Sequence, residues 1–237
     1  YMYCDSAYHY SKQQKIKAFG NIKISQADTL ILTGEKLTYY GGKENADIKG
    51  NVNLSDKFIN LKTEQIFYDF KTDIANYPKS GIITQKNKEI KSKKGEYYSK
   101  IHKFIFTDSV LVTTKNYNIN TDNMHYYSNN NIYMFFGPSY LESDNKTIYC
   151  ENGWHNSKTG ISQFQQNAYI NSESQIITGD SIYYDENRNY GKILNNAKVT
   201  DTTEDINVYG DFVEYFENKK IIEITKKPIL EIILEDD

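Results

Sequence analysis

The chain has 237 residues, with 28 Lys and Arg against 31 Asp and Glu, which gives a formal net charge of −3. This near balance excludes the basic surface that nucleic-acid binding requires, so we expect no nucleic-acid partner. No segment approaches the roughly 18 consecutive apolar residues of a membrane-spanning helix. β-Branched and aromatic residues mark the regular segments and only three prolines interrupt them, so the composition predicts an all-β protein.

A repeat of about 29 residues runs along the chain, and each unit has an aromatic or imidazole anchor. The anchors are His9, Tyr39, Tyr68, Tyr97, Tyr126, His155, Tyr184 and Tyr215. An apolar residue stands seven positions before each anchor, a small residue five before it and, in all units but one, an acid four before it. Because the eight units fill the chain, they leave no segment for a separate catalytic domain, and a repeat array is predicted.

Two turn signals divide each unit, as in the one anchored by Tyr39. Gly41 and Gly42 follow the anchor, and Ser55-Asp56-Lys57 comes half a period later. Two turns per unit predict two strands of about ten residues, each paired with its neighbours in sequence. The predicted fold is an all-β, antiparallel array of about sixteen strands in eight hairpin units, forming one domain over residues 1–237. Because the first unit begins in mid-strand, we expect this domain to be a fragment of a longer chain.

The first strand of each unit must bend. Leu32 and Leu37 belong to two apolar columns of opposite parity, which a flat strand cannot present to a single interior. A kink or bulge is therefore expected between them, at the acidic column that contains Glu35. There the carboxylate can accept backbone N–H groups that an irregular strand leaves unpaired, which favours a structural role for the acids over a metal ladder. Stacked bent strands predict two sheets that meet in a V or a flattened roll.

The apolar columns predict which side chains line the interior of this roll. From the first strands they are Leu32, Leu61, Ile90, Ile119, Ile148, Ile177 and Val208, and from the second strands Ile22, Val52 and Val110. These residues are the candidates for a lipid-binding groove. A lumen that is filled by its own side chains would show the same columns, so this alternative stays open.

No catalytic, cofactor or metal site is predicted. The four histidines, His9, His102, His125 and His155, lack metal-ligand spacing, and the chain contains no phosphate-binding loop, nucleophile elbow or Ser-His-Asp pattern. Cys4 and Cys150 occupy the same small-residue column five units apart, where we expect buried fillers without a disulfide. The tyrosines suit strand packing better than a sugar-binding surface. The sequence therefore predicts a protein that is not an enzyme.

The repeated unit resembles the OstA/LptA family of organic-solvent-tolerance and lipopolysaccharide-transport proteins. The similarity rests on TLILTGEKLTYYGGKENADIKGNVNL (29–54), which returns as ITGDSIYYDENRNYGKILNNAKV (177–199) and in part as CDSAYHYSKQQKIKAFGNIKI (4–24). CDSAYHY, FFGPSYLES (135–143) and IYCENGWH (148–155) are most similar to OstA-like proteins of Bacteroidetes. The chain departs from the pattern at Lys93, which replaces the acid. It departs also at Gly95 and Gly153, which stand two positions before the anchor, where most other repeats have an apolar side chain.

The resemblance implies an antiparallel β-jellyroll, or β-taco, whose groove carries the acyl chains of lipopolysaccharide or a related glycolipid. It implies a periplasmic location in the envelope of a Gram-negative bacterium and a bridge toward the outer membrane, with no catalytic residues or cofactor. The segment PILEIILEDD (228–237) predicts an apolar edge for pairing with a second copy or with another OstA-fold domain.

Two other functions remain open from the sequence. One is a structural or adhesive β-solenoid scaffold with a closed core. The other, less favoured, is a β-helical enzyme acting on polysaccharides, which would use outward acids such as Glu151 and Asp180.

Overall fold

The computed structural model describes residues 1–26 and 30–232, and within these ranges the protein is built of β-strands and short 3-10 turns without an α-helix. The chain divides into two compact units. The first unit comprises Tyr1–Lys115 and His125–Asn129, and the second comprises Asn116–Met124 and Asn130–Asp237. The expectation of a single domain over residues 1–237 stays a prediction.

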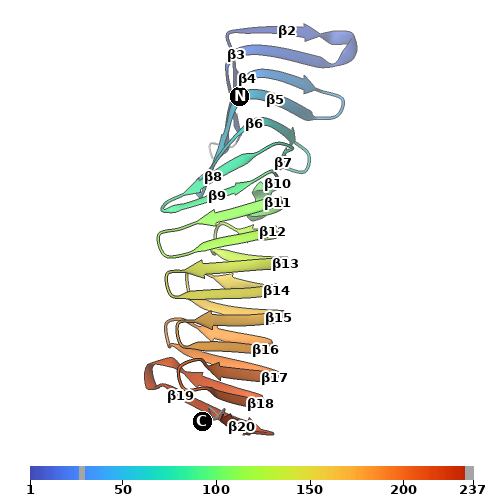
Figure 1. The fold of residues 1–237 in the computed structure, drawn as a ribbon. Helices are drawn as coiled ribbons and strands as arrows, with labels where there is room; N and C mark the ends of the chain where they lie inside the picture. Colours follow the sequence, from blue (N-terminus) through green and yellow to red (C-terminus); the bar gives the residue numbers. More distant parts are fainter. Residues whose placement is uncertain (27–29, 233–237) are drawn as a thin grey trace. The chain divides into compact units, whose positions relative to one another are not determined.

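The first unit contains eleven strands and two 3-10 turns among its described residues (Figure 1). They are β1 (Met2–Tyr3), β2 (Ser6–Tyr10), η1 (Ser11–Gln13), β3 (Lys15–Gln26), β4 (Leu30–Tyr40), β5 (Asn45–Ser55), β6 (Asn60–Asp69), β7 (Ile74–Tyr77), β8 (Gly81–Gln85), β9 (Lys88–Ser92), β10 (Lys94–Tyr98), η2 (Ser99–Ile101) and β11 (Lys103–Thr113).

The second unit continues the same pattern. Its elements are β12 (Asn118–Tyr127, of which the last three residues belong to the first unit), β13 (Ile132–Ser143), β14 (Lys146–Asn156), β15 (Ile161–Ser172), β16 (Gln175–Asp185), β17 (Tyr190–Asp201), β18 (Ile206–Phe216), η3 (Glu217–Lys219), β19 (Ile221–Lys226) and β20 (Ile229–Ile232).

Within each unit, strands that follow one another in sequence pair in antiparallel fashion, which confirms the predicted meander. In the second unit β13 to β18 pair in order, with Ile148 opposite Ile170 and Ile170 opposite Ile177. The structure has twenty strands in its described part instead of about sixteen, because β1/β2, β7/β8, β9/β10 and β19/β20 each represent one expected strand that is interrupted at its bend. The fold is an antiparallel β-jellyroll.

A β-bulge bends the strands where the sequence predicts a kink, but the extra residue lies on the second strand of each 29-residue repeat. Phe19 pairs with Lys36 and Ile22 pairs with Gly34, so Gly20 and Asn21 together face Glu35 alone. Both residues of the bulge have positive φ, 72° for Gly20 and 42° for Asn21. Glycine and asparagine tolerate this left-handed conformation, which explains why Asn51, Asn167 and Asn196 stand at the same position of other repeats, also with positive φ.

The acids stabilise the bulge through side chains rather than by accepting backbone N–H groups, which corrects the sequence-based expectation. The Asn21 amide donates to Asp5 at 2.9 Å, and Asn167 donates to Glu151 at 2.9 Å. Asn51 makes the same hydrogen bond to Glu35. Asp180 accepts from Asn196 in the same way, so four acids of the column hold the bulged residue of the following strand, which supports a structural role for them.

The single exception to the acidic column keeps the contact with the partners exchanged. Lys93 donates to Asp108 at 3.0 Å, and Asp108 is one of two residues with positive φ at that bulge. This contact lowers the pKa of the Asp108 carboxyl below its ordinary value. The departure of Lys93 from the repeat pattern is therefore compensated within the same bulge.

The interior of the first unit is filled by aromatic rings. Tyr77, Tyr97, Phe104 and Phe106 are fully buried. Phe104 stacks on Tyr97 at 4.3 Å and on Phe106 at 5.3 Å between ring centroids. The Tyr77 ring occupies the space that a Cβ on Gly95 would need, and its hydroxyl hydrogen-bonds Ser92 Oγ at 2.5 Å. The apolar column that Gly95 empties is thus filled from a neighbouring strand.

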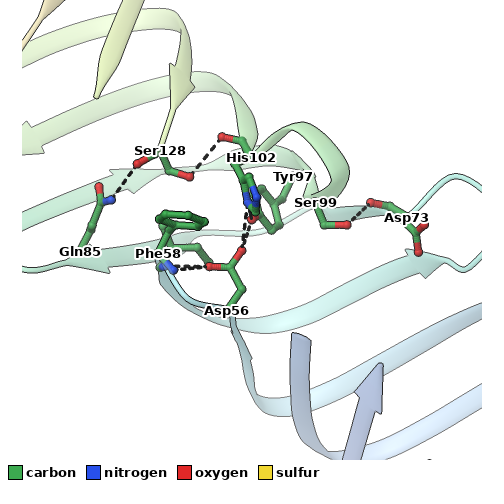
Figure 2. Close-up of polar contacts among 9 residues, drawn as sticks. Asp56, Phe58, Asp73, Gln85, Tyr97, Ser99, His102 and Ser128 are labelled. Atoms are coloured by element: carbon green, nitrogen blue, oxygen red, sulfur yellow. Dashed lines mark hydrogen bonds and ion pairs between the residues drawn. The ribbon is translucent and has the colours of Figure 1, made fainter. Parts of the chain in front are cut away.

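The turns that follow the anchors lie along one edge of each compact unit, which we call the first rim. Hydrogen bonds join each of these turns to the next. In the first unit the Ser99 N–H donates to the Asp73 carbonyl at 3.2 Å, and the Ser128 N–H donates to the His102 carbonyl at 2.9 Å. The accepting residues have positive φ, 57° for Asp73 and 50° for His102. The Ser99 and Ser128 hydroxyls reinforce these contacts (Figure 2). The second rim is made by the turns that fall half a period later.

Candidate functional site

The groove of the second unit is the candidate site. One cavity of this groove has a volume of about 730 Å³ and is lined by Val199, Ile206 and Val208 together with polar residues of the turns. A second cavity of about 150 Å³ is lined by Leu141, Ile148, Phe164 and others. A constriction of about 20 Å³, lined by Ile170, Ile177, Ile182 and Ile193, shares Lys146 with both.

A polar cluster crosses this groove from rim to rim. Lys146, at the start of β14, donates to the Tyr184 hydroxyl at 3.0 Å, and its ammonium lies 4.5 Å from the centroid of the Tyr184 ring. The Tyr184 hydroxyl donates to Glu217 at 2.8 Å, and Lys146 lies 3.5 Å from the same carboxylate oxygen. Burial, followed by this hydrogen bond to Glu217, raises the pKa of Tyr184 above its ordinary value, so the phenol stays protonated. We name these three residues the Lys146 clasp.

Two related clasps join the rims of the first unit. In the Lys88 clasp, Lys88 donates to the Tyr126 hydroxyl at 2.9 Å, and that hydroxyl hydrogen-bonds Gln85. In the Asp56 clasp, Asp56 accepts hydrogen bonds from the Phe58 N–H at 2.7 Å and from Tyr97.

His102 completes the Asp56 clasp (Figure 2). Its Nδ1 lies 3.2 Å from the Tyr97 hydroxyl and 3.7 Å from Asp56, while its ring packs edge-on against Phe58 at 4.6 Å. Desolvation by burial raises the pKa of Tyr97, and the hydrogen bond to Asp56 adds to the effect. The first unit is thus closed from rim to rim over a core that its own rings fill.

The predicted groove residues fall into two groups. Leu32, Leu61, Ile90, Ile22, Val52 and Val110 belong to the first unit and are at most 2% exposed, as is Ile119 of the second unit. In the second unit Ile148, Ile177 and Val208 line the cavities just described, and Ile148 and Val208 are half-buried. All ten lie in the interior of their unit, and their contact with a lipid stays a prediction.

The clasps were not found from the sequence, although a periodic signal for them exists. Lys88, Tyr117 and Lys146 are spaced by 29 residues, and so are their partners Tyr126, His155 and Tyr184. Tyr117 packs edge-on against His155 at 5.4 Å, so this pair occupies the place of a lysine and a tyrosine. Four anchor tyrosines, Tyr68, Tyr97, Tyr126 and Tyr184, are buried, and Tyr39 and Tyr215 are half-buried. We expected these side chains to pack between strands and did not expect their hydroxyls to connect the rims.

The described part of the chain also contains histidines, cysteines and acids outside the clasps. No three His, Cys, Asp or Glu side chains there gather as metal ligands, and no helix there has the length and apolarity to span a membrane. Both cysteines are free, and burial raises the pKa of the Cys150 thiol to about 12. The acids Glu151 and Asp180, considered above for an enzyme, accept hydrogen bonds from Asn167 and Asn196.

The bulged antiparallel strands, the rims and the apolar interior define a β-jellyroll of the kind that encloses an elongated groove. Comparison with known proteins agrees with this class. The model of OstA-like proteins matches residues 1–122, and the model described as LptA/(LptD N-terminal domain) LPS transport protein matches residues 89–221. The chain belongs to the OstA/LptA family.

A solved structure adds a more distant comparison. LptH, the LptA-homologous periplasmic component of the lipopolysaccharide transport device of Pseudomonas aeruginosa, is 14% identical with a TM-score of 0.25, and the alignment covers 54% of this chain and 75% of LptH. No curated protein matches the chain.

Proposed function

We propose that the protein transports lipopolysaccharide or a related glycolipid through the periplasm of a Gram-negative bacterium by holding acyl chains in the groove of the second unit. Its membership of a family described by lipopolysaccharide transport supports this proposal. The observation that carries it is the cavity of about 730 Å³ with the half-buried Val208 in its lining, which lies within the size range of ligand pockets. Neither catalysis nor a cofactor is part of the proposal.

The energetics of acyl-chain burial suit a carrier. Each buried methylene contributes about 0.8 kcal/mol, so a dozen would contribute roughly 10 kcal/mol before the cost of association is subtracted. Equivalent apolar rows in successive strands give the acyl chain a series of binding positions of similar free energy. We propose that a lipid moves along these rows, and that pairing of the edge strands with another OstA-fold domain extends the path toward the outer membrane.

Photo-crosslinking in cells tests this function. A photoreactive residue at Ile148 or Val208 is expected to form adducts with lipopolysaccharide, because both side chains line cavities of the groove. Thr147 is the matched control, since it neighbours Ile148 on the same strand and its side chain points to the opposite face. Absence of adducts at Ile148 and Val208, or equal adducts at Thr147, would contradict the proposal.

A closed structural scaffold is the second candidate, and the aromatic core of the first unit favours it. The fully buried rings of β7, β10 and β11 fill the interior between these strands, although a cavity of about 610 Å³ lies elsewhere in the unit, beside Tyr40 and Phe67. Native mass spectrometry of protein purified without added lipid distinguishes the two functions. A scaffold would carry no copurified lipid and would not bind added lipopolysaccharide.

A further inference from the structure

The Lys146 clasp lies between the two main cavities of the second-unit groove. Lys146 lines the large cavity, the small cavity and the constriction that separates them. Tyr184 lines the constriction and the small cavity, and Glu217 lines the constriction and the large one. An acyl chain that extends from one cavity into the other through this constriction therefore meets the side chains of the clasp.

The chemistry of the clasp indicates what would displace it. Lys146 carries the positive charge, and Glu217 neutralises it at 3.5 Å. The Glu217 side chain is 36% exposed and lies on the short turn η3, whereas the Lys146 side chain is 22% exposed and packs on the Tyr184 ring. Glu217 is thus the partner that solvent reaches more readily. An anion from a ligand can take its place and accept hydrogen bonds from both the Lys146 ammonium and the Tyr184 hydroxyl.

The Lys88 clasp of the first unit provides an internal comparison. It has the same lysine–tyrosine contact, but the tyrosine hydroxyl donates to the neutral Gln85 at the end of β8 and not to a carboxylate on a first-rim turn. The aromatic rings nearby, such as Phe104 and Tyr126, are fully buried. A carboxylate that competes for the lysine is therefore found beside the hollow interior, and a neutral amide is found beside the filled one.

We propose that the Lys146 clasp is a ligand-operated gate, in which the anionic headgroup of a glycolipid replaces Glu217 at Lys146 and so opens the constriction to the acyl chain. This inference rests on the proposed function, since it assumes that the groove binds a lipid. It assigns Lys146 and Tyr184 as headgroup ligands and Glu217 as the group that keeps the empty groove closed.

The test compares diphosphorylated lipid A with the same lipid after its phosphates are removed, with binding to the full chain measured by native mass spectrometry. Lys146→Met is expected to bind the phosphorylated lipid about tenfold more weakly, because one charge-assisted contact is lost, and to bind the dephosphorylated lipid as the wild type does. Lys146→Arg is expected to restore binding. Glu217→Gln is expected to bind the phosphorylated lipid more tightly, since the competing carboxylate is gone.

The matched control is Lys88→Met, which removes the equivalent lysine of the first unit and is expected to leave both affinities unchanged. Deep-rough lipopolysaccharide, which adds sugar carboxylates to the same lipid, identifies the anion. An effect of Lys146→Met on lipid A assigns the phosphate, and an effect confined to lipopolysaccharide assigns a carboxylate.

Two results would overturn the proposal. Lys146→Met could bind both forms of lipid A and lipopolysaccharide as the wild type does, or it could lose affinity for all of them equally. Either result would overturn the gate and leave the proposed lipid transport intact. If the wild type binds none of these lipids, the proposed function fails and the gate fails with it. Thermal unfolding of each variant, followed by circular dichroism, shows whether the fold is retained.

Discussion

Lys93 and Asp108 show what the bulge requires of individual side chains. In four repeats an acid on one strand accepts from an asparagine on the next, and here a lysine donates to an aspartate across the same bulge. The common requirement is a donor and an acceptor that face one another across the bulge, whichever strand carries the charge. The acid itself is replaceable as long as its partner changes with it.

We predict that reversing one partner destabilises the protein and that reversing both restores it. Lys93→Glu places two carboxylates opposite each other, whereas Lys93→Glu combined with Asp108→Asn again supplies a carboxylate and an asparagine amide across the bulge, as Glu35 and Asn51 do. Thermal unfolding of the wild type, both single variants and the double variant measures the coupling. Lys62→Glu reverses an exposed charge on β6 as the control. Equal melting temperatures for Lys93→Glu and the double variant would contradict the prediction.

The buried ammonium of Lys88 gives a second prediction, on pH. Burial lowers its pKa from 10.5 to about 8, so between these values the unfolded chain binds a proton that the folded chain does not. Stability therefore rises with pH across this window as far as Lys88 is concerned. Below about pH 8 both states are protonated, and the cost of burying the charge is constant.

Urea unfolding between pH 8 and 9.5 measures this contribution before the tyrosines ionise. The free energy of unfolding of the wild type is expected to rise more steeply with pH than that of Lys88→Met, which lacks the titrating group. Parallel pH profiles for the two proteins would show that Lys88 titrates normally.

At the scale of the strand, the small-residue column has a specific cause. Gly34 stands beside the bulge, where an added Cβ would lie 2.5 Å from the Cγ2 of Ile48, a fully buried side chain. The strands approach closely because the bend brings their inner faces together. Small side chains are therefore needed where the strand bends at the bulge, and the small-residue column marks this bend in the jellyroll.

Gly34→Ala is expected to destabilise the protein by about 1–3 kcal/mol, the usual cost of overpacking a core. Gly191→Ala is the control, because its added Cβ would meet neighbours at 3.5 Å or more, which is ordinary contact. Chemical denaturation of both variants gives the difference. A Gly34 variant as stable as the Gly191 variant would mean that Ile48 moves aside without cost.

The strands and their bends could be predicted from periodicity, whereas the contacts that close the roll could not. Leu32 and Leu37 reveal by their parity that the strand bends, because burial leaves a pattern in the sequence. The strand that carries the bulge was assigned wrongly, since the left-handed residues Gly20 and Asn21 lie on the partner. Whether an interior is filled depends on rings such as Tyr77, which cross from one strand into the space left by another.

At the scale of the molecule, the last described strand carries an apolar edge. Ile229, Leu230 and Ile232 are 56–63% exposed, and β20 pairs with β18. The remainder of the predicted edge, residues 233–237, lies outside the described part of the chain. Such an edge favours addition of another strand, so pairing between copies is expected for this chain.

Leu230→Lys is expected to reduce self-association of the 237-residue chain, because it adds a charge to the apolar edge. Ile176→Lys is the control, since it places the same charge on β16, which pairs with strands on both sides. Sedimentation velocity over a range of concentrations measures the effect. Equal behaviour of the wild type and Leu230→Lys would exclude this edge as the contact.

The hydrogen bonds between successive turns of the first rim have a consequence for how such a chain can change in length. Each first-rim turn must keep its size, because its N–H and carbonyl groups meet those of the turns before and after it. The second-rim connections differ, from the two residues between β8 and β9 to the four between β17 and β18. We therefore expect insertions and epitope tags to be tolerated on the second rim, while the first rim preserves the repeat period within each unit.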